Sequence, residues 1–231
     1  QNDPAIPFHY DVDDIQPKYA DKKALRERLW LRDTFTPILA YVGRLDAQKG
    51  VHLLHEAIFY AISHGAQFVL LGSAPDPEIN REFWALKAEL NDNPDVHIEL
   101  AYDAELSRLI YAGADIMLVP SNYEPCGLAQ LIAMRYGTVP VVRRIGGLVD
   151  TVFDREYSDR PEGERNGFVF RDPDRTAITW VLERALRLWY DDPVAFRSLM
   201  ENGMRQDHSW KEPAQRYLAI YEAALQEAPS V

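Results

Sequence analysis

The stretch ILAYVGRLDAQKGVHLLHEAIFYAISHGAQFVLLG, residues 38–72, decides the fold prediction. It contains two apolar runs, at 38–43 and 67–72, that are typical of buried strands. Between them, residues 50–63 carry apolar side chains at helical spacing. Apolar strands that are separated by helices indicate a parallel sheet that is covered on both faces. The stretch therefore predicts the first two strands of such a sheet.

The same alternation continues along the chain. Further strands are predicted at 96–102, 115–120, 138–142 and 167–170, and further helices at 20–31, 80–92, 103–114, 127–137, 176–190, 194–206 and 213–225. The pattern predicts an α/β fold, a doubly wound, mostly parallel Rossmann-like sheet followed by a C-terminal helical tail. Residues 1–20 are Pro-rich and acidic, so we expect a linker or surface extension, and residues 21–231 are expected to form one domain. The charged loop 154–167 is expected to be solvated.

The composition excludes or disfavours several classes of partner and of binding site. With a net charge of −11 over 231 residues, the chain is a poor candidate for binding nucleic acid or an anionic membrane, although a local basic pocket for a small anion is compatible with it. A single cysteine excludes an internal disulfide framework and a cysteine-rich zinc site. The six histidines show no metal-ligand spacing. No apolar run approaches the roughly 18 residues that a membrane span needs.

Ligands of such sheets bind beyond the carboxyl ends of the strands, so we searched the segments that follow each strand. GRLDAQKG, residues 43–50, places Arg44 and Lys49 across a strand-to-helix turn, and two cations there would suit a diphosphate. The segment matches neither the Walker A loop nor the GxGxxG dinucleotide fingerprint, which makes a dehydrogenase improbable. Taken alone, a pair of solvated cations is an equally good interpretation.

SNYEPCGLAQL, residues 121–131, offers a second cluster. Pro125 restricts Glu124 to extended conformations and so holds its carboxylate in place. A helix is predicted to begin near Gly127, and the free amides of Leu128 and Ala129 would bind an anion. A fixed carboxylate beside an anion-binding helix start suits a negatively charged leaving group with a reacting centre next to it.

Four other positions at these strand ends are candidates. Cys126 has no assignable partner histidine, so we interpret it as a small buried packing residue. Tyr102 could stack on a planar base or be an ordinary rim aromatic. Gly72, in GSAPD, would let the backbone come close to a ligand. RRIGGLVDT, residues 143–151, supplies a close-approach glycine pair, and its two arginines could simply be solvated.

Five stretches together resemble one family. GRLDAQKG, LLGSAPDP, YAGADIMLVPSNYEPCGLAQL, AMRYGTVPVVRRIGGLVDTVFD and HSWKEPAQRYLAIYEAAL closely resemble the starch and bacterial glycogen synthases, from about residue 36 to 226. These are retaining glucosyltransferases of the GT-B type, with two Rossmann-like domains facing each other across a cleft. Within these stretches, the residues LLGSAPDP and TVFD are most similar to those of the plant soluble starch synthases of classes III and IV. The resemblance implies that residues 21–231 are the C-terminal, nucleotide-sugar-binding half and that the N-terminal half is not in this sequence.

The resemblance also implies a reaction and a site. Glucose would pass from ADP-glucose to the non-reducing end of an α-1,4-glucan with retention, without a metal or other cofactor, and a front-side substitution is the family's favoured mechanism. Glu124 would serve the transferred glucose as a catalytic residue, together with Arg44 and Lys49 on the ADP phosphates. Tyr102 would stack on adenine. The remaining donor-binding positions would be Gly72, Cys126, Gly127, Leu128 and Ala129.

The chain departs from the family pattern at Ala129 and at Ile145, where threonine is common. The alternatives are a nucleotide- or glucan-binding fragment without turnover, or a related enzyme with another donor such as UDP-glucose. EPCGL disfavours the second, because many such relatives carry a glutamate at the position of Ala129. The isolated half is expected to be inactive, to expose its last helix and to self-associate weakly. Its expected location is a plastid for a plant or alga and the cytoplasm for a bacterium.

Overall fold

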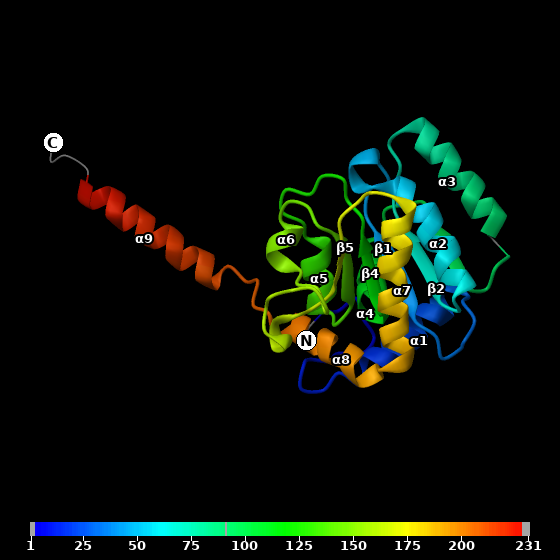
Figure 1. Ribbon diagram of the computed structural model, residues 1–231, viewed down its shortest axis with the longest axis horizontal. Coiled ribbons are helices and arrows are strands. Elements are labelled where there is room, and N and C mark those ends of the chain that lie inside the picture. The colour runs from blue at the N-terminus through cyan, green and yellow to red at the C-terminus, as the bar shows by residue number, and fades with distance from the viewer. Residues whose placement is uncertain (1–2, 91, 228–231) are drawn as a thin grey trace.

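A six-stranded parallel sheet forms the centre of the molecule (Figure 1). The computed structural model describes residues 3–90 and 92–227. The strand order is β3-β2-β1-β4-β5-β6, and every neighbouring pair is parallel. The strands are β1 (Ile38–Val42), β2 (Gln67–Leu71), β3 (Val96–Glu99), β4 (Ile116–Val119), β5 (Val139–Arg143) and β6 (Phe168–Phe170). The predicted doubly wound Rossmann-like sheet is confirmed, and the order reverses between β1 and β4.

Helices connect the strands and complete the chain. They are α1 (Lys18–Leu29), α2 (Leu54–Ser63), α3 (Pro77–Leu90), α4 (Ala104–Gly113), α5 (Ala129–Arg135), α6 (Leu148–Thr151), α7 (Arg175–Asp191), α8 (Pro193–Arg205) and α9 (Lys211–Glu227). Short 3₁₀ turns lie at Ala47–Lys49, Val51–Leu53 and Glu162–Glu164. The predicted helical tail after Arg171 is confirmed as α7, α8 and α9. No helix in the described part of the chain is long and apolar enough to span a membrane.

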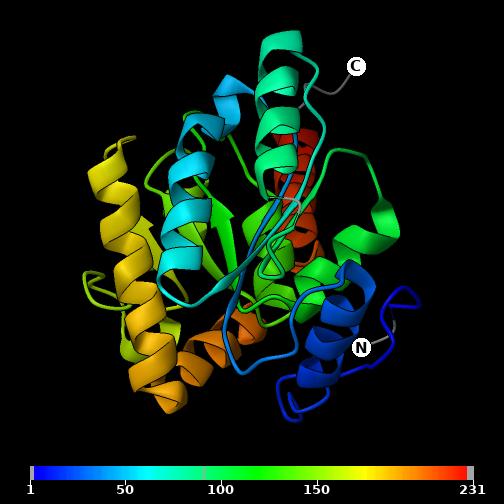
Figure 2. The ribbon, with the colours of Figure 1, turned by 90° about the vertical axis from the view of Figure 1, so that its right-hand side faces the viewer.

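The strands are apolar throughout because both faces of the sheet are buried. Leu39 and Tyr41 of β1 belong to one core cluster, while Ile38 and Ala40 of the same strand belong to the other. The first cluster lies under α2 and α7, which pack side by side in Figure 2. The second lies under α1 and α4, which pack against each other on the opposite face. This alternation of side chains between two cores is the physical basis of the continuous apolar runs.

The segment expected to be a linker or extension, 1–20, packs against the domain through several buried residues. Ile6, Tyr10 and Ile15 are buried, and α1 already begins at Lys18. The Tyr10 hydroxyl donates to the Tyr136 carbonyl at 2.9 Å. Scattered apolar residues without periodicity therefore anchor this stretch, which the sequence pattern alone did not indicate. The assignment of 21–231 as one functional domain stays a prediction.

The structure differs from the predicted elements at several points. The helix expected from residue 50 begins at Leu54, because Gly50 has a left-handed φ of 71° and separates two 3₁₀ turns. Of the helix expected at 80–92, α3 covers the part up to Leu90 and begins earlier, at Pro77; residue 91 lies outside the described residues. The short helix α6 was not predicted. Four residues are too few to show a helical period.

Helix α9 extends away from the body of the molecule (Figure 1). Residues 211–225 of this helix are all exposed, and Tyr217, Leu218, Tyr221 and Leu225 are among the large exposed hydrophobic side chains. An apolar stripe at helical spacing normally faces a packed partner. The expected exposure of the last helix is therefore present in this structure.

Candidate active site

The site lies at the carboxyl ends of β1 and β4, which are adjacent strands in the sheet. The loop after β1 runs through Arg44 and Lys49, and the loop after β4 runs through Glu124. The amides of Asn122 and Tyr123 both donate to the Gln48 carbonyl, at 2.8 and 3.2 Å. The two loops are thus joined by backbone hydrogen bonds before any side chain is considered.

Gly50 makes this close approach possible. A Cβ at this position would lie 2.0 Å from the Pro120 carbonyl oxygen, and the φ of 71° is one that other residues rarely adopt. The Asp46 carboxylate caps the turn before it by accepting from the Lys49 amide at 2.9 Å. The backbone around Lys49 is therefore held against the end of β4.

Lys49 and Glu124 form an ion pair, with Nζ 2.6 Å from Oε2. The Glu124 side chain is buried, and its Oε2 also accepts from the Ser121 hydroxyl at 2.9 Å. The sequence prediction put Lys49 on phosphate and Glu124 on sugar as separate groups. The fold places them in direct contact, so any anion that Lys49 binds lies next to this carboxylate.

The Arg44 side chain extends from the same turn and is exposed to solvent. Its guanidinium is 3.2 Å from the Asp46 carboxylate, and its carbonyl accepts from the Tyr41 hydroxyl at 2.6 Å. Burial raises the pKa of Tyr41, so this hydroxyl keeps its proton and stays a donor at neutral pH. The backbone of Arg44 is fixed while the guanidinium can reach a ligand.

The loop of residues 124–126 is held in place by the glycine pair after β5. The Gly147 amide donates to the carbonyls of Glu124 and Pro125, at 3.0 and 3.2 Å. A Cβ on Gly146 would lie 1.9 Å from the Glu124 carbonyl oxygen, and one on Gly147 would lie 2.3 Å from that of Cys126. The close approach predicted for this pair is an approach to the protein backbone itself, and it sets the position of Glu124.

Gly127 turns the chain into α5 with a φ of 78°. Leu128 is the N-cap residue and α5 starts at Ala129, two residues later than predicted. Within the described chain, no acceptor pairs with the amides of Leu128 and Ala129. The buried Gln130 amide nitrogen donates to the Gly127 carbonyl at 3.0 Å and to the Thr151 hydroxyl at 3.2 Å. The turn is thereby locked, and the two amides are available to an anion.

Cys126 is exposed, and the expectation of a buried packing residue is wrong. Its backbone, rather than its side chain, makes the tight contact, because its carbonyl lies against Gly147. A cysteine is usually buried in a core, but here the turn before α5 directs the side chain outward.

Gly72 directly follows β2, and Tyr102 follows β3, the neighbouring strand of the sheet. Tyr102 is 90% exposed, just before α4, and no described ring packs on it. A Cβ on Gly72 would lie 2.4 Å from the Gly43 carbonyl oxygen, so Gly72 keeps the exits of β1 and β2 adjacent. Ile145 is partly buried against the core cluster under α1 and α4. Ligand roles for these positions stay predictions.

Sequence reasoning missed Ser121 and Arg143. Solvation was one possibility for Arg143, yet its Nη1 donates to the carbonyls of Ser121 and Asn122 at 3.4 and 3.2 Å. Its Nε donates to the Arg171 carbonyl at 2.9 Å. Arg143 therefore ties the loop after β4 to the chain after β6. Its position at the last residue of a strand beside β4 was the available signal.

Chemically, the arrangement offers a cation, an exposed guanidinium and two free amides around one buried carboxylate. Such a set suits a phosphorylated ligand whose reacting carbon faces the carboxylate. No group of three or more His, Cys, Asp or Glu side chains that could hold a metal ion lies within residues 3–90 and 92–227.

Comparison with known proteins places this geometry in a family. Residues 24–203 match the family model described as glycosyl transferases group 1. The chain belongs to that family. Proteins similar to it include glycogen synthase 2 of Methylococcus capsulatus, 59% identical over 95% of this chain, and glycogen synthase 1 of Synechococcus sp. strain JA-3-3Ab, 59% identical over 94%. The chain spans about half the length of these curated relatives, 45% and 44%.

A solved structure is also very similar to this chain. The catalytic domain of starch synthase IV from Arabidopsis thaliana, bound to ADP and acarbose, superposes with a TM-score of 0.94 at 39% identity. The match covers 98% of this chain and 46% of that one. The expected resemblance to starch and glycogen synthases is confirmed. The bacterial glycogen synthases share more identity with this chain than this plant enzyme does.

Proposed function

We propose that this chain is the donor-binding half of an ADP-glucose-dependent α-glucan synthase. The observation that carries the proposal is the Lys49–Glu124 pair at the carboxyl ends of β1 and β4, 2.6 Å apart. It is supported by the similarity to a starch synthase IV domain that holds ADP and acarbose. The shared coverage of about half of each relative supports a two-domain parent, of which this is the C-terminal half.

In this proposal Arg44 and Lys49 bind the diphosphate of the donor. The Lys49 ammonium has three donor positions, of which Glu124 uses one in this structure. The others are free to meet phosphate oxygens, and Arg44 can supply a bidentate contact from its exposed position. The free amides of Leu128 and Ala129 add donors for the terminal phosphate. Tyr102 then covers the adenine ring.

Glu124 acts on the sugar side. As the bond between the anomeric carbon and the diphosphate oxygen breaks, positive charge develops on that carbon, and the buried carboxylate stabilises it. Arg44 and Lys49 stabilise the negative charge of the departing ADP in the same step. The new bond forms to the 4-hydroxyl oxygen at the non-reducing end of an α-1,4-glucan, with retention, and the proton of that hydroxyl passes to the departing diphosphate oxygen. These two cations supply the positive charge at the leaving group, so we propose that no metal ion takes part.

The acceptor and the cleft wall that holds it belong, in this proposal, to the N-terminal half. The higher identity to bacterial glycogen synthases favours glycogen as the polymer over starch. The compartment, a bacterial cytoplasm or a plastid, follows from the source and stays a prediction.

Isothermal titration calorimetry of the chain with ADP tests the proposal. Lys49→Ala should weaken ADP binding by about tenfold or more, because a charge-assisted contact to phosphate is lost. Lys23→Ala is the matched control: Lys23 lies exposed on α1 in a surface ion pair with Glu27. Equal ADP affinity in the Lys49→Ala variant and the parent would reject the phosphate assignment. UDP that binds as tightly as ADP would reject ADP-glucose as the donor.

A further inference from the structure

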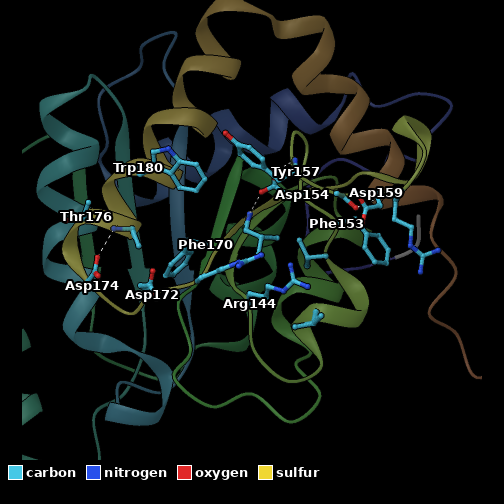
Figure 3. A pocket seen from close by; sticks show the side chains of 17 residues that line it. Arg144, Phe153, Asp154, Tyr157, Asp159, Phe170, Asp172, Asp174, Thr176 and Trp180 are labelled. Carbon is cyan, nitrogen blue, oxygen red and sulfur yellow. Dashed lines mark hydrogen bonds between the residues drawn. The ribbon is translucent and has the colours of Figure 1, made fainter.

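A pocket of about 810 Å³ lies between β6, α7 and the loop after α6 (Figure 3). None of Arg44, Lys49, Tyr102 or Glu124 lines it. Its size is in the range of small-molecule sites. It reaches the edge of the sheet where the candidate active site lies, because Arg144 and Asp172 in its wall closely follow β5 and β6.

Two aromatic rings border one end of the pocket. The rings of Tyr157 and Trp180 have centroids 5.7 Å apart and are tilted by 34°. Both are large apolar surfaces open to solvent, 67% and 42% exposed. In Figure 3 they lie together at this end, with Arg144 and Asp172 towards the other. A pair of exposed rings on a pocket wall is a surface for a flat, partly apolar ligand.

The rings are held in place by a buried arginine. The Arg184 guanidinium lies 4.5 Å from the centroid of Trp180 and 4.7 Å from that of Tyr157. It forms ion pairs with Asp154 at 2.6 Å and with Glu156 at 2.8 Å. The loop 154–167, expected to be solvated, is therefore anchored where it carries Tyr157. A ligand meets a surface that is already ordered, which lowers the entropy cost of binding.

Polar groups of both signs share the pocket wall with the rings. The lining contains Asp159 and Asp172 as well as Arg144 and Arg171, and Thr176 from the first turn of α7. Because carboxylates and guanidinium groups are both present, the wall does not favour a highly charged ligand of either sign, and a purely apolar ligand would leave all these groups unpaired. A neutral molecule with many hydroxyls can use donors and acceptors together. Sugar rings have such hydroxyls at their rim and an apolar C–H face that packs on an aromatic ring.

We propose that this pocket is a second glucan subsite, in which glucose units of an α-1,4-linked chain pack on Trp180 and Tyr157. The choice of an α-1,4-glucan as the sugar rests on the proposed function. The subsite keeps the polymer on the enzyme between transfers, close to the edge where the donor binds. Holding the polymer in this way raises the effective concentration of its chain ends at the transfer site.

Calorimetry with maltoheptaose tests the subsite in the chain as it is. Trp180→Ala and Tyr157→Ala should each raise the dissociation constant for maltoheptaose by about fivefold or more, because a ring surface is lost. Tyr157→Ala guards against misfolding, since this ring is the more exposed of the two. Trp84→Ala is the matched control, because Trp84 is a 53% exposed aromatic on α3 outside the pocket and should leave the constant unchanged.

ADP titrations of the same proteins separate this inference from the proposed function. ADP affinity should be equal in the parent and in all three variants. Maltoheptaose affinity that is unchanged in both pocket variants, or absent in the parent, would overturn the subsite. ADP affinity that falls in the pocket variants would overturn it as well and assign the pocket to the nucleotide. A parent that binds maltoheptaose through these rings but fails to bind ADP would leave the subsite supported and reject only the proposed function.

Discussion

At the scale of single residues, the central feature is a carboxylate and an ammonium that lie 75 positions apart in the chain. Glu124 is buried, but it is not isolated, because Lys49 and the Ser121 hydroxyl both donate to one of its oxygens. A buried carboxylate needs such partners to remain charged. The same contacts hold the carboxylate beside the position where we propose that the diphosphate binds.

Glu124→Gln in the full-length parent enzyme is expected to lower kcat by about 100-fold or more, because the charge that stabilises the transition state is removed. ADP affinity should stay equal or rise, since Lys49 loses its ion-pair partner and can turn fully to phosphate. Steady-state kinetics together with ADP calorimetry measure both effects. Turnover close to that of the parent enzyme would remove Glu124 from the mechanism.

A second residue-scale prediction concerns Lys18, which is buried and donates to the Ala112 and Tyr136 carbonyls and the Thr138 hydroxyl. Burial lowers the pKa of Lys18 from 10.5 to about 7. Between these values the unfolded chain holds a proton that the folded protein lacks, so the unfolding free energy rises with pH. For one proton the slope is at most about 1.4 kcal/mol per pH unit.

Urea denaturation at pH 6, 7, 8 and 9 measures this slope. Lys18→Met lacks the ionisable group, so its unfolding free energy should rise less between pH 7 and 9 than that of the parent. Near pH 6, where Lys18 is protonated in both the folded and the unfolded state, the pH dependence of the two proteins should converge. Identical slopes over the whole range would show that the Lys18 pKa is not lowered by folding.

At the scale of elements, loops rather than strands hold the site together. Gly50 lets the loop after β1 meet the end of β4, and Gly146 and Gly147 let the loop after β5 contact residues 124–126. Each contact joins the backbones of two loops, so a side chain on any of these glycines would separate them. The alternation of strands and helices specifies which loops meet, and the glycines decide how closely they do.

Gly50→Ala should destabilise the chain by about 2 kcal/mol or more, because the new methyl group would overlap the Pro120 carbonyl and the φ of 71° is strained for alanine. It should also weaken ADP binding by moving Lys49. Gly163→Ala is the matched control, since no atom lies within 4 Å of a Cβ there. Urea denaturation and ADP calorimetry measure both effects. A Gly50→Ala variant as stable as Gly163→Ala would contradict this account of the loop contact.

At the scale of the whole molecule, residues 211–225 of helix α9 are exposed to solvent. The chain spans about half of the synthases it resembles, and α9 carries Tyr217, Leu218 and Tyr221 in exposed positions. These features suit a half-protein whose cleft is completed by a second domain. Weak self-association through α9 stays a prediction on the same grounds.

The purified chain alone is therefore expected to transfer negligible glucose. Catalysis needs an acceptor hydroxyl placed on the donor and water kept out, and one domain supplies a single wall of that cleft. Incorporation of labelled glucose from ADP-glucose into glycogen is the assay, with a full-length synthase as the positive control. Turnover within about tenfold of that control would show that one domain is sufficient.

The sequence by itself determined the sheet, its covering helices and the segments that carry the site. Apolar runs and helical periods are local, and a parallel α/β sheet brings the carboxyl ends of its strands to one edge whatever the loops do. Arg44, Lys49 and Glu124 could therefore be assigned to that edge from their positions after β1 and β4. The motif resemblance added the family, which the comparisons confirm.

Only the tertiary structure decided which of these groups touch. The packing of the loops decides three features of the site. These are the Lys49–Glu124 ion pair, the hydrogen bonds from Arg143 to the loop after β4, and the exposure of Cys126. The pocket lined by Trp180 also depends on tertiary packing, because Arg184 donates to the Asp154 carboxylate, 30 positions away in the sequence. Such contacts are made by irregular backbone between distant segments, and their geometry depends on sterics at single glycines. No period or spacing in the chain encodes that information.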